Sequence, residues 1–282
     1  MRTLVITGAS DGIGAAAARI LEGPRNHLVL VGRNTDKTAA IARDTGADAL
    51  TADFTDLAQV RALATTLLDR YPRIDVLANN AGGLYAGPEL TGDGFEKSFQ
   101  INHLAPFLLT HLLMDRLMES RTAVVNTSSF ASILYARPDL DDPQTLEGFT
   151  ENRAYGNAKL WNILFTKELH RRFHTDSGPG IDAVAFHPGV IRTNFAADAG
   201  GYPRRVYHSV VSKFLASAHR GGQNLVHFMT GIPGRTWESG GFYGTNFRPM
   251  RTHRMASDPA AAHTLWETSE EMLGLPADPA TS

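Results

Sequence analysis

The sequence contains no cysteine and no long apolar run. Without cysteine the chain forms neither a disulfide framework nor a thiolate metal site, a composition typical of cytoplasmic proteins. The longest central apolar stretch, 104–114, is interrupted by Pro106, Thr110 and His111, and it is too short to span a bilayer core about 30 Å thick. The N-terminus enters a strand pattern at once and leaves no room for a secretory signal. We therefore expect a soluble, cytoplasmic protein that does not associate with membranes.

The sequence also lacks a block of like charge. Lysine and arginine number 27 and aspartate and glutamate 29, which gives a net charge of −2. Because nucleic-acid binding generally needs a basic face, we expect no nucleic-acid partner. Apolar residues make up 43% of the chain and are spread from Leu4 to Leu273, which predicts one large core. Since doubly wound folds often use this length for one domain, we interpret 1–282 as a single domain.

Short β-branched runs alternate with longer amphipathic segments over the first two thirds of the chain. The predicted strands are 3–7, 27–31, 47–51, 74–79, 123–127 and 182–186, and the predicted helices include 13–21, 57–71, 107–118 and 153–172. The strand runs are continuously apolar, which is typical of strands covered on both faces. This βαβα order predicts an α/β fold with a doubly wound, mostly parallel sheet of the Rossmann type, in three αβα layers.

Two later segments break this order. Residues 134–151 are polar and carry Pro138 and Pro143, so we expect an inserted surface loop there. Residues 194–222 contain three turn-forming residues and then an apolar helix-like run, 206–218. Aromatic residues in this segment would close over a cleft as a substrate lid, although ordinary packing of a helix on the sheet explains them equally well. A last helix is expected over 260–273.

A glycine-rich turn follows the first strand and opens a helix. Its glycines, Gly8, Gly12 and Gly14, form the pattern GxxxGxG. Absent side chains let backbone N–H groups approach a pyrophosphate, and the helix N-terminus adds roughly half a positive charge. A glycine turn is weak evidence by itself, but its position between a strand and a helix strengthens it. We predict that this turn binds a dinucleotide through Gly8, Ser10, Asp11, Gly12, Ile13 and Gly14.

The end of the second strand indicates which dinucleotide is bound. An NAD site usually places an acid there, on the ribose hydroxyls. This strand instead ends in Arg33 and Asn34, and a guanidinium suits a 2′-phosphate. A solvated arginine in a turn is the alternative. We therefore predict cofactor contacts from Arg33 and Asn34 and expect NADP(H) rather than NAD(H).

Tyr155 and Lys159 lie one helical turn apart in a predicted helix. Side chains four residues apart share one face of a helix, with Cβ atoms about 5–6 Å apart. An ammonium beside a phenol favours the phenolate, which would lower the tyrosine pKa from about 10 toward neutrality and allow proton transfer. The pair is common in ordinary helices, so it indicates chemistry only in combination with the glycine turn.

These motifs together resemble the short-chain dehydrogenase/reductase family. The resemblance covers about residues 2–250 and rests on Thr7-Gly8-x-x-x-Gly12-x-Gly14, Asn79-Asn80-Ala81-Gly82, a serine after the fifth strand and Tyr155-x-x-x-Lys159. The segments 99–104, 125–129, 155–165, 187–189 and 270–276 resemble the retinol dehydrogenase-like branch. We find no membrane anchor of the kind that many members of that branch carry, so we do not expect retinoid specificity.

The resemblance implies four catalytic residues. Tyr155 would be the general acid for carbonyl reduction and the general base for alcohol oxidation, and Lys159 would hold the nicotinamide ribose and lower the tyrosine pKa. Ser129, rather than the adjacent Ser128, would hydrogen-bond the substrate oxygen. Asn102 would complete a proton relay through its backbone and a bound water; local bonding inside a helix is its alternative role.

The resemblance also implies further cofactor contacts. Asp53 would hold the adenine amino group, with Phe54 beside it, and Thr193 would bind the carboxamide. The other contacts that it implies are Asn80, Ala81, Gly82, Pro188, Gly189 and Val190. All of these residues follow predicted strands, where open α/β sheets bind ligands.

The expected activity is NADP-dependent reduction of a ketone or aldehyde, reversible to alcohol oxidation. Reduction of a carbon–carbon double bond on the same fold and a regulatory protein that senses NADP without chemistry are the alternatives. We expect a small, apolar carbonyl or alcohol substrate and a possible homo-oligomer. His103, His111 and His187 show no metal-ligand spacing, so we expect no metal and interpret them as structural or surface residues.

Overall fold

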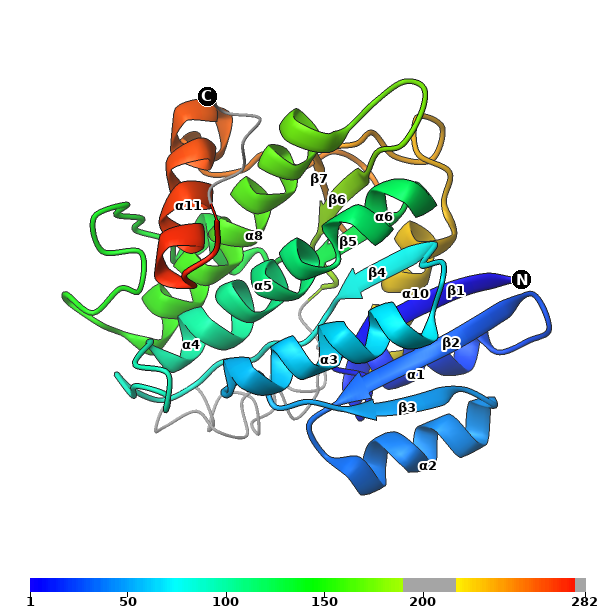
Figure 1. Ribbon diagram of the computed structural model, residues 1–282. Helices are drawn as coiled ribbons and strands as arrows, with labels where there is room; N and C mark the ends of the chain where they lie inside the picture. The colour runs from blue at the N-terminus through cyan, green and yellow to red at the C-terminus, as the bar shows by residue number, and fades with distance from the viewer. Residues whose placement is uncertain (190–216, 277–282) are drawn as a thin grey trace.

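A computed structural model describes residues 1–189 and 217–276 of the protein (Figure 1). A parallel sheet of seven strands runs through these residues, in the order β3-β2-β1-β4-β5-β6-β7. The chain winds outward in one direction from β1 and in the other from β4, and helices cover both faces of the sheet. The prediction of a doubly wound α/β fold is confirmed.

The strands agree with the sequence prediction to within two residues, apart from the last one. They are β1 (Arg2–Thr7), β2 (Asn26–Gly32), β3 (Asp48–Thr51), β4 (Val76–Asn79), β5 (Ala123–Thr127), β6 (Asp182–Phe186) and β7 (Gly241–Tyr243). The prediction missed β7, because three residues that begin with glycine carry no pattern of their own. Its stability comes from pairing with β6, where Ala185 faces Phe242.

Alternate strand residues enter two separate apolar clusters, one on each face of the sheet. In β1, Leu4 and Ile6 pack on one side and Val5 on the other, and all three are fully buried. The first cluster is covered by α1 (Gly12–Leu21), α2 (Thr35–Thr45) and α10 (Ala218–Thr230). The second is covered by α3 (Leu57–Arg70), α5 (Ala105–Leu112), α8 (Glu151–Phe173) and α11 (Pro259–Met272). Because both faces are covered, the interiors of the central strands β1 and β4 are apolar, whereas the edge strand β3 has no buried residue.

The short helices and two irregular turns complete the described chain. They are α4 (Lys97–Phe99), a π-helical turn at Gln100–Leu104, α6 (Met114–Ser120), α7 (Ala131–Leu134) and a 3₁₀ turn at Arg254–Ser257. The helical segment predicted over 107–118 therefore begins ten residues earlier, at Lys97. It contains a π turn, which the spacing of apolar residues does not predict. None of the described helices is both long and apolar enough to cross a membrane.

The two segments that break the βα order are only partly described. Residues 218–222 of the predicted lid form the first turn of α10, which packs closely on α1, since a Cβ on Gly222 would lie 2.7 Å from Ala16 Cβ. The rest of the lid prediction, 194–216, lies outside the described residues.

The insert at 134–151 is clamped to α8 rather than lying freely on the surface. Asn157 on α8 accepts a hydrogen bond from the Arg137 N–H (2.8 Å) and donates to Thr145 Oγ1 (2.8 Å). Trp161 Nε1, one turn further on, donates to the Pro143 carbonyl (2.9 Å). Because Thr145 is buried, the insert adds to the core as well as to the surface.

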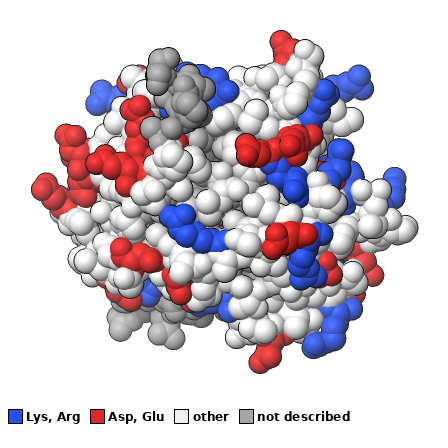
Figure 2. All heavy atoms as spheres, in the orientation of Figure 1, with Lys and Arg blue, Asp and Glu red and all other residues white. Residues whose placement is uncertain are grey.

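Charged side chains are mixed on the face shown in Figure 2, where acidic and basic residues lie side by side. This mixture agrees with the small net charge of −2. Acidic residues gather at the left edge of that view, and no basic patch that would attract a polyanion appears on that face.

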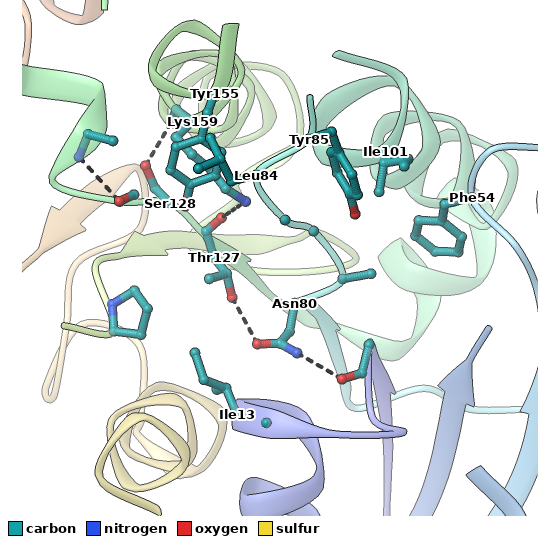
Figure 3. Close-up of a pocket in the computed structure, with 18 of the residues that line it drawn as sticks. Ile13, Phe54, Asn80, Leu84, Tyr85, Ile101, Thr127, Ser128, Tyr155 and Lys159 are labelled. Atoms are coloured by element: carbon teal, nitrogen blue, oxygen red, sulfur yellow. Dashed lines mark hydrogen bonds between the residues drawn. The ribbon is translucent and has the colours of Figure 1, made fainter. Parts of the chain in front are cut away.

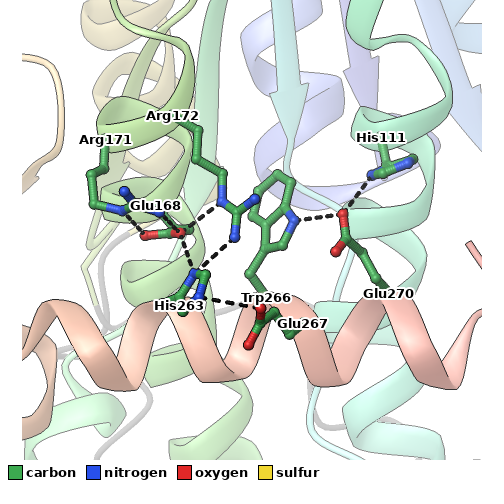
Figure 4. A network of polar contacts seen from close by, with 8 residues as sticks. All are labelled: His111, Glu168, Arg171, Arg172, His263, Trp266, Glu267 and Glu270. Atoms are coloured by element: carbon green, nitrogen blue, oxygen red, sulfur yellow. Dashed lines mark hydrogen bonds and ion pairs between the residues drawn. The ribbon is translucent and has the colours of Figure 1, made fainter. Parts of the chain in front are cut away.

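The C-terminal helix α11 is held on α8 by a buried polar and aromatic contact (Figure 4). Glu168 is almost fully buried and pairs with Arg171 (2.6 Å) and Arg172 (2.7 Å). Burial raises the pKa of the Glu168 carboxyl, but the two arginines outweigh it and lower the pKa overall. Trp266 lies 4.8 Å from the Arg172 guanidinium and 4.8 Å from the ring of Phe107. These contacts tie the end of the chain to the helix that carries Tyr155.

We expect Trp266→Ala to lower the free energy of unfolding by about 3–5 kcal/mol, because it opens a cavity where three helices meet. Trp266→Phe keeps a ring and should lose clearly less. Urea unfolding followed by circular dichroism measures both variants. Equal losses for the two would show that the ring contacts do not hold α11.

Candidate active site

One cavity of about 470 Å³ lies at the carboxyl ends of the strands, where the sheet order reverses between β1 and β4. Parallel sheets bind ligands at this point. Among the predicted site residues, the cavity is lined by Gly8, Ser10, Asp11, Gly12, Ile13, Arg33, Asp53, Phe54, Asn80, Ala81, Gly82, Ser129, Tyr155, Lys159, Pro188 and Gly189. Gly14, Asn34 and Asn102 do not line it. Val190 and Thr193 lie outside the described residues.

The glycine turn lies at one end of the cavity. Gly8 has a φ of +66°, and a Cβ there would lie 2.7 Å from Ala81 Cα, so no other residue fits this turn without strain. Gly14 serves packing instead, because a Cβ there would lie 2.9 Å from Ala9 Cα. The turn leads into α1, where the Asp11 carboxylate caps the helix and accepts a hydrogen bond from the Gly12 N–H (2.7 Å). The first turn of a helix offers further N–H groups to an anion.

Arg33 and Asn34 follow β2 at the same end of the cavity. Arg33 is exposed and lines the cavity. Asn34 is the N-cap of α2, where its side-chain oxygen accepts a hydrogen bond from the Lys37 N–H (2.9 Å). The side-chain oxygen of Asn34 is therefore engaged in capping α2, and Asn34 does not line the cavity, so nothing in the structure supports its predicted contact with the cofactor. The run Asn34-Thr35-Asp36-Lys37 is a helix-start signal that could have indicated this cap.

Thr7 joins the ends of β1 and β4. Its Oγ1 accepts hydrogen bonds from the N–H groups of Asn80 and Ala81, both at 3.0 Å. The Asn80 amide donates back to the Thr7 carbonyl (2.9 Å). Backbone polar groups at the strand ends are thus satisfied within the protein, and the turn after β4 is held in place.

The two serines after β5 have different environments. Ser128 is buried, and its hydroxyl donates to the Lys159 carbonyl (2.6 Å). Ser129 lies on the cavity wall, and its oxygen accepts a hydrogen bond from the Ala131 N–H (3.2 Å). An accepted bond leaves the Ser129 O–H to donate, because a hydroxyl is both donor and acceptor. Of the two, only Ser129 offers its hydroxyl proton to the cavity.

Tyr155 and Lys159 come from the first turns of α8. Lys159 is 2% exposed, and its Nζ donates to the Thr127 carbonyl (3.1 Å) and lies 5.6 Å from the centre of the Tyr155 ring. Burial lowers the pKa of the Lys159 ammonium to about 7, because an apolar surrounding disfavours the charged form. The lysine is therefore a titratable group near neutral pH, beside the tyrosine.

Asn102 lies in the π turn, behind the cavity wall. Its amide donates to the carbonyls of Ser98 (2.8 Å) and Gly83 (3.0 Å), and its oxygen accepts from the Gly83 N–H (3.1 Å). The side chain thus holds the segment after β4 against the helix. A relay through Asn102 would have to use its backbone, as the resemblance implies, since its amide is fully engaged.

Eight further residues that line the cavity were not predicted from the sequence. They are Leu84, Tyr85, Phe130, Ala131, Leu134, Tyr135, Asn152 and His187. Each follows a strand or precedes Tyr155 by one helical turn, so position relative to the strand ends was the available signal. The apolar side chains among them belong to no motif that the sequence alone would reveal.

His187 lines the cavity, so its interpretation as a structural or surface residue was incomplete. Its Nδ1 accepts a hydrogen bond from the Phe130 N–H (3.2 Å), which places the ring proton on Nε2. Burial lowers the pKa of the imidazole to about 4. The ring is therefore neutral at physiological pH. His103 differs, because it is fully buried and bonded to Ser269 (3.0 Å).

A model of the short chain dehydrogenase family matches residues 2–201. The chain belongs to this family. Members are oxidoreductases that use a nicotinamide dinucleotide, and the glycine turn, Ser129, Tyr155 and Lys159 lie along one cavity, as the family's chemistry requires.

Full-length relatives agree with this assignment. A protein named as a candidate daunorubicin C-13 ketoreductase, from Streptomyces sp. (strain C5), is 38% identical over 97% of this chain and 93% of its own. Retinol dehydrogenase 12 of Mus musculus is 33% identical over 97% of this chain and 87% of its own. The crystal structure of an uncharacterized protein from Mycobacterium paratuberculosis has a TM-score of 0.76 at 34% identity, over 98% of this chain and 96% of that one.

The buried lysine makes stability depend on pH. A lysine whose folded-state pKa is about 7, below its ordinary 10.5, releases its proton in the folded protein while the unfolded chain keeps it. The free energy of unfolding should therefore rise with pH between about pH 7 and pH 10. Lys159→Met should lack this rise, as measured by urea unfolding at both ends of the range.

Lys37→Met, which removes an exposed lysine, is the matched control. The pH dependence of its free energy of unfolding should follow that of the parent protein. If the free energy of unfolding depends on pH in the same way in Lys159→Met and the parent, burial does not lower the pKa of Lys159.

Proposed function

We propose that this short-chain dehydrogenase reduces a ketone or aldehyde with NADPH and oxidises the corresponding alcohol in the reverse direction. The observation that carries the proposal is that Ser129, Tyr155 and Lys159 line the same cavity as the glycine turn. The names of the two relatives, a ketoreductase and a retinol dehydrogenase, support a carbonyl or alcohol substrate.

The residues present fit a dinucleotide. Gly8 and Gly12 line the cavity with φ of +66° and +55°, and because they have no side chains the turn exposes its backbone to a ligand. The N–H groups that open α1 would hold the pyrophosphate, and Asp53 and Phe54 would hold the adenine. Asn80, Ala81, Gly82, Pro188 and Gly189 would line the path to Lys159, which would hold the ribose hydroxyls. When bound, the nicotinamide supplies or accepts the hydride.

The chain's own residues would handle the substrate oxygen. Ser129 would donate its free O–H to the carbonyl and stabilise the negative charge that develops on the oxygen. Tyr155 would give its proton to that oxygen in reduction and take it back in oxidation. Lys159, 5.6 Å from the phenol ring, would stabilise the phenolate that results.

The environment of Arg33 supports a preference for NADP. No acid stands at the end of β2, where an NAD site usually places one on the ribose hydroxyls. Arg33 occupies that position and lines the cavity. A guanidinium there favours the additional phosphate.

Tyr155→Phe tests the proton transfer. We expect kcat to fall about 100- to 10,000-fold, the usual contribution of general acid–base catalysis. Binding of NADPH, followed by its fluorescence, should remain because the ring stays in place. Retained turnover would refute the mechanism.

Product analysis with an enone, 4-phenylbut-3-en-2-one, tests the type of reaction. The allylic alcohol is the expected product of NADPH oxidation. A saturated ketone would assign the cavity to reduction of the double bond instead.

Arg33→Ala tests the cofactor preference. Loss of a hydrogen bond to a charged phosphate should raise the KM for NADPH about 10- to 100-fold, with little change for NADH. Arg43→Ala, which removes an exposed arginine from the nearby helix α2, should change neither value. A parent enzyme that already favours NADH would contradict the assignment.

A further inference from the structure

Exposed apolar side chains gather at the mouth of the cavity. Phe130, Leu134 and Tyr135 are 43%, 51% and 42% exposed, and all three line the cavity. They fall within six consecutive residues that begin directly after Ser129. An apolar surface left open at a cavity mouth indicates a ligand that covers it.

This apolar wall is held rigidly against α8. Gly156 lets it approach, because a Cβ there would lie 2.8 Å from the Ala136 N and 2.9 Å from the Ala131 carbonyl oxygen. Asn157, the next residue, bonds both the N–H (2.8 Å) and the carbonyl (3.2 Å) of Arg137. The wall is thus fixed at both ends relative to Tyr155, so it presents a preformed surface.

Leu84 and Tyr85 lie on the segment after β4, beside Tyr155 and Lys159 (Figure 3). Leu84 is buried, and the Tyr85 ring is half-buried with Lys97 Nζ 5.8 Å from its centre. The substrate end of the cavity is therefore bounded by apolar and aromatic side chains from two segments. Aromatic side chains pack well on flat ring systems.

Asn152 places one polar group beside this surface. It precedes Tyr155 by three residues on α8, so the two side chains share a helix face. Its side chain is exposed and lines the cavity, and its amide makes no hydrogen bond within residues 1–189 and 217–276. An amide can donate and accept, about one helical turn from the proton-transferring phenol.

We propose that the substrate is a carbonyl compound built on a flat, apolar ring system with a hydrogen-bonding substituent. The rings would lie on Phe130, Leu134 and Tyr135, the carbonyl would face Ser129 and Tyr155, and the substituent would bond Asn152. This inference rests on the proposed carbonyl reduction and adds the class of molecule that the site selects.

The first test compares ketones in steady-state assays with NADPH. The probes are butan-2-one, 1-(naphthalen-2-yl)ethanone and its ring-hydroxylated analogue, 1-(6-hydroxynaphthalen-2-yl)ethanone. We expect kcat/KM for the naphthyl ketone to exceed that for butan-2-one about 100-fold or more, since each apolar group bound contributes roughly 10-fold or more. Equal values for the two would overturn the proposal while leaving carbonyl reduction intact.

Variants then locate the surface. Leu134→Ala should lower kcat/KM for the naphthyl ketone about 10-fold and lower kcat/KM for butan-2-one clearly less. Leu146→Ala is the matched control, because Leu146 belongs to the same insert, is 45% exposed and does not line the cavity. Equal effects of the two variants on the naphthyl ketone would contradict the role of the wall.

Asn152→Ala should remove the advantage of the hydroxylated ketone over its parent, a change of roughly 3- to 10-fold. The surface variant Asn246→Ala should keep that advantage. An advantage that survives in Asn152→Ala would overturn the polar part of the proposal.

A binding measurement separates the two proposals. Calorimetric titration of the naphthyl ketone into Tyr155→Phe saturated with NADP⁺ reports recognition without turnover. If the parent enzyme reduces no ketone but the titration shows binding that a further Leu134→Ala change weakens, carbonyl reduction is refuted and the ring site is retained. If the naphthyl ketone does not bind but the parent enzyme reduces butan-2-one, the ring site is refuted and carbonyl reduction is retained.

Discussion

The bond between the Lys159 ammonium and the carbonyl that ends β5 sets the arrangement of the whole cavity. Lys159 Nζ donates to the Thr127 carbonyl (3.1 Å), while the Lys159 carbonyl accepts from the hydroxyl of Ser128 (2.6 Å). One residue of α8 is therefore bonded at both ends to consecutive residues of the sheet. An ammonium buried without partners would be costly, so the helix is held where this bond can form, and Tyr155 is placed one turn away.

Two further contacts keep α8 in this position along its length. Toward the N-terminus, Asn157 and Trp161 bind the backbone of the insert. Toward the C-terminus, Arg172, which pairs with Glu168, contacts Trp266 of α11. A catalytic pair needs its geometry fixed to within a fraction of an ångström. The last helix therefore supports the site without lining the cavity, whereas the insert both holds α8 and lines the cavity through Leu134 and Tyr135.

The sequence predicted what depends on local pattern. Six strands were found because β-branched runs bounded by turns need no tertiary information. The missed α2 buries few apolar side chains, among them Ile41, and it is defined by its caps at Asn34 and Gly46. The π turn around Asn102 is a change of hydrogen-bond register that leaves no compositional trace.

The same distinction applies to the site. Polar residues and glycines at strand ends were predicted, because the physics of phosphate and proton transfer restricts their types. The apolar wall was not, since its position depends on how closely residues 131–136 approach Gly156, a property of the packed structure. Asn34 shows a second role at a strand end, since its side-chain oxygen caps α2.

The apolar wall also affects the environment of Lys159. Burial lowers the pKa of the Lys159 ammonium to about 7, and a flat apolar ligand over Leu134 and Tyr135 would remove more water from the same region. Hydrogen bonds and charges act more strongly where water is excluded, so Ser129 would stabilise a developing oxyanion better with the mouth covered. Recognition of an apolar ring and stabilisation of charge at the carbonyl are thus linked through one shared property, the low polarity of the cavity.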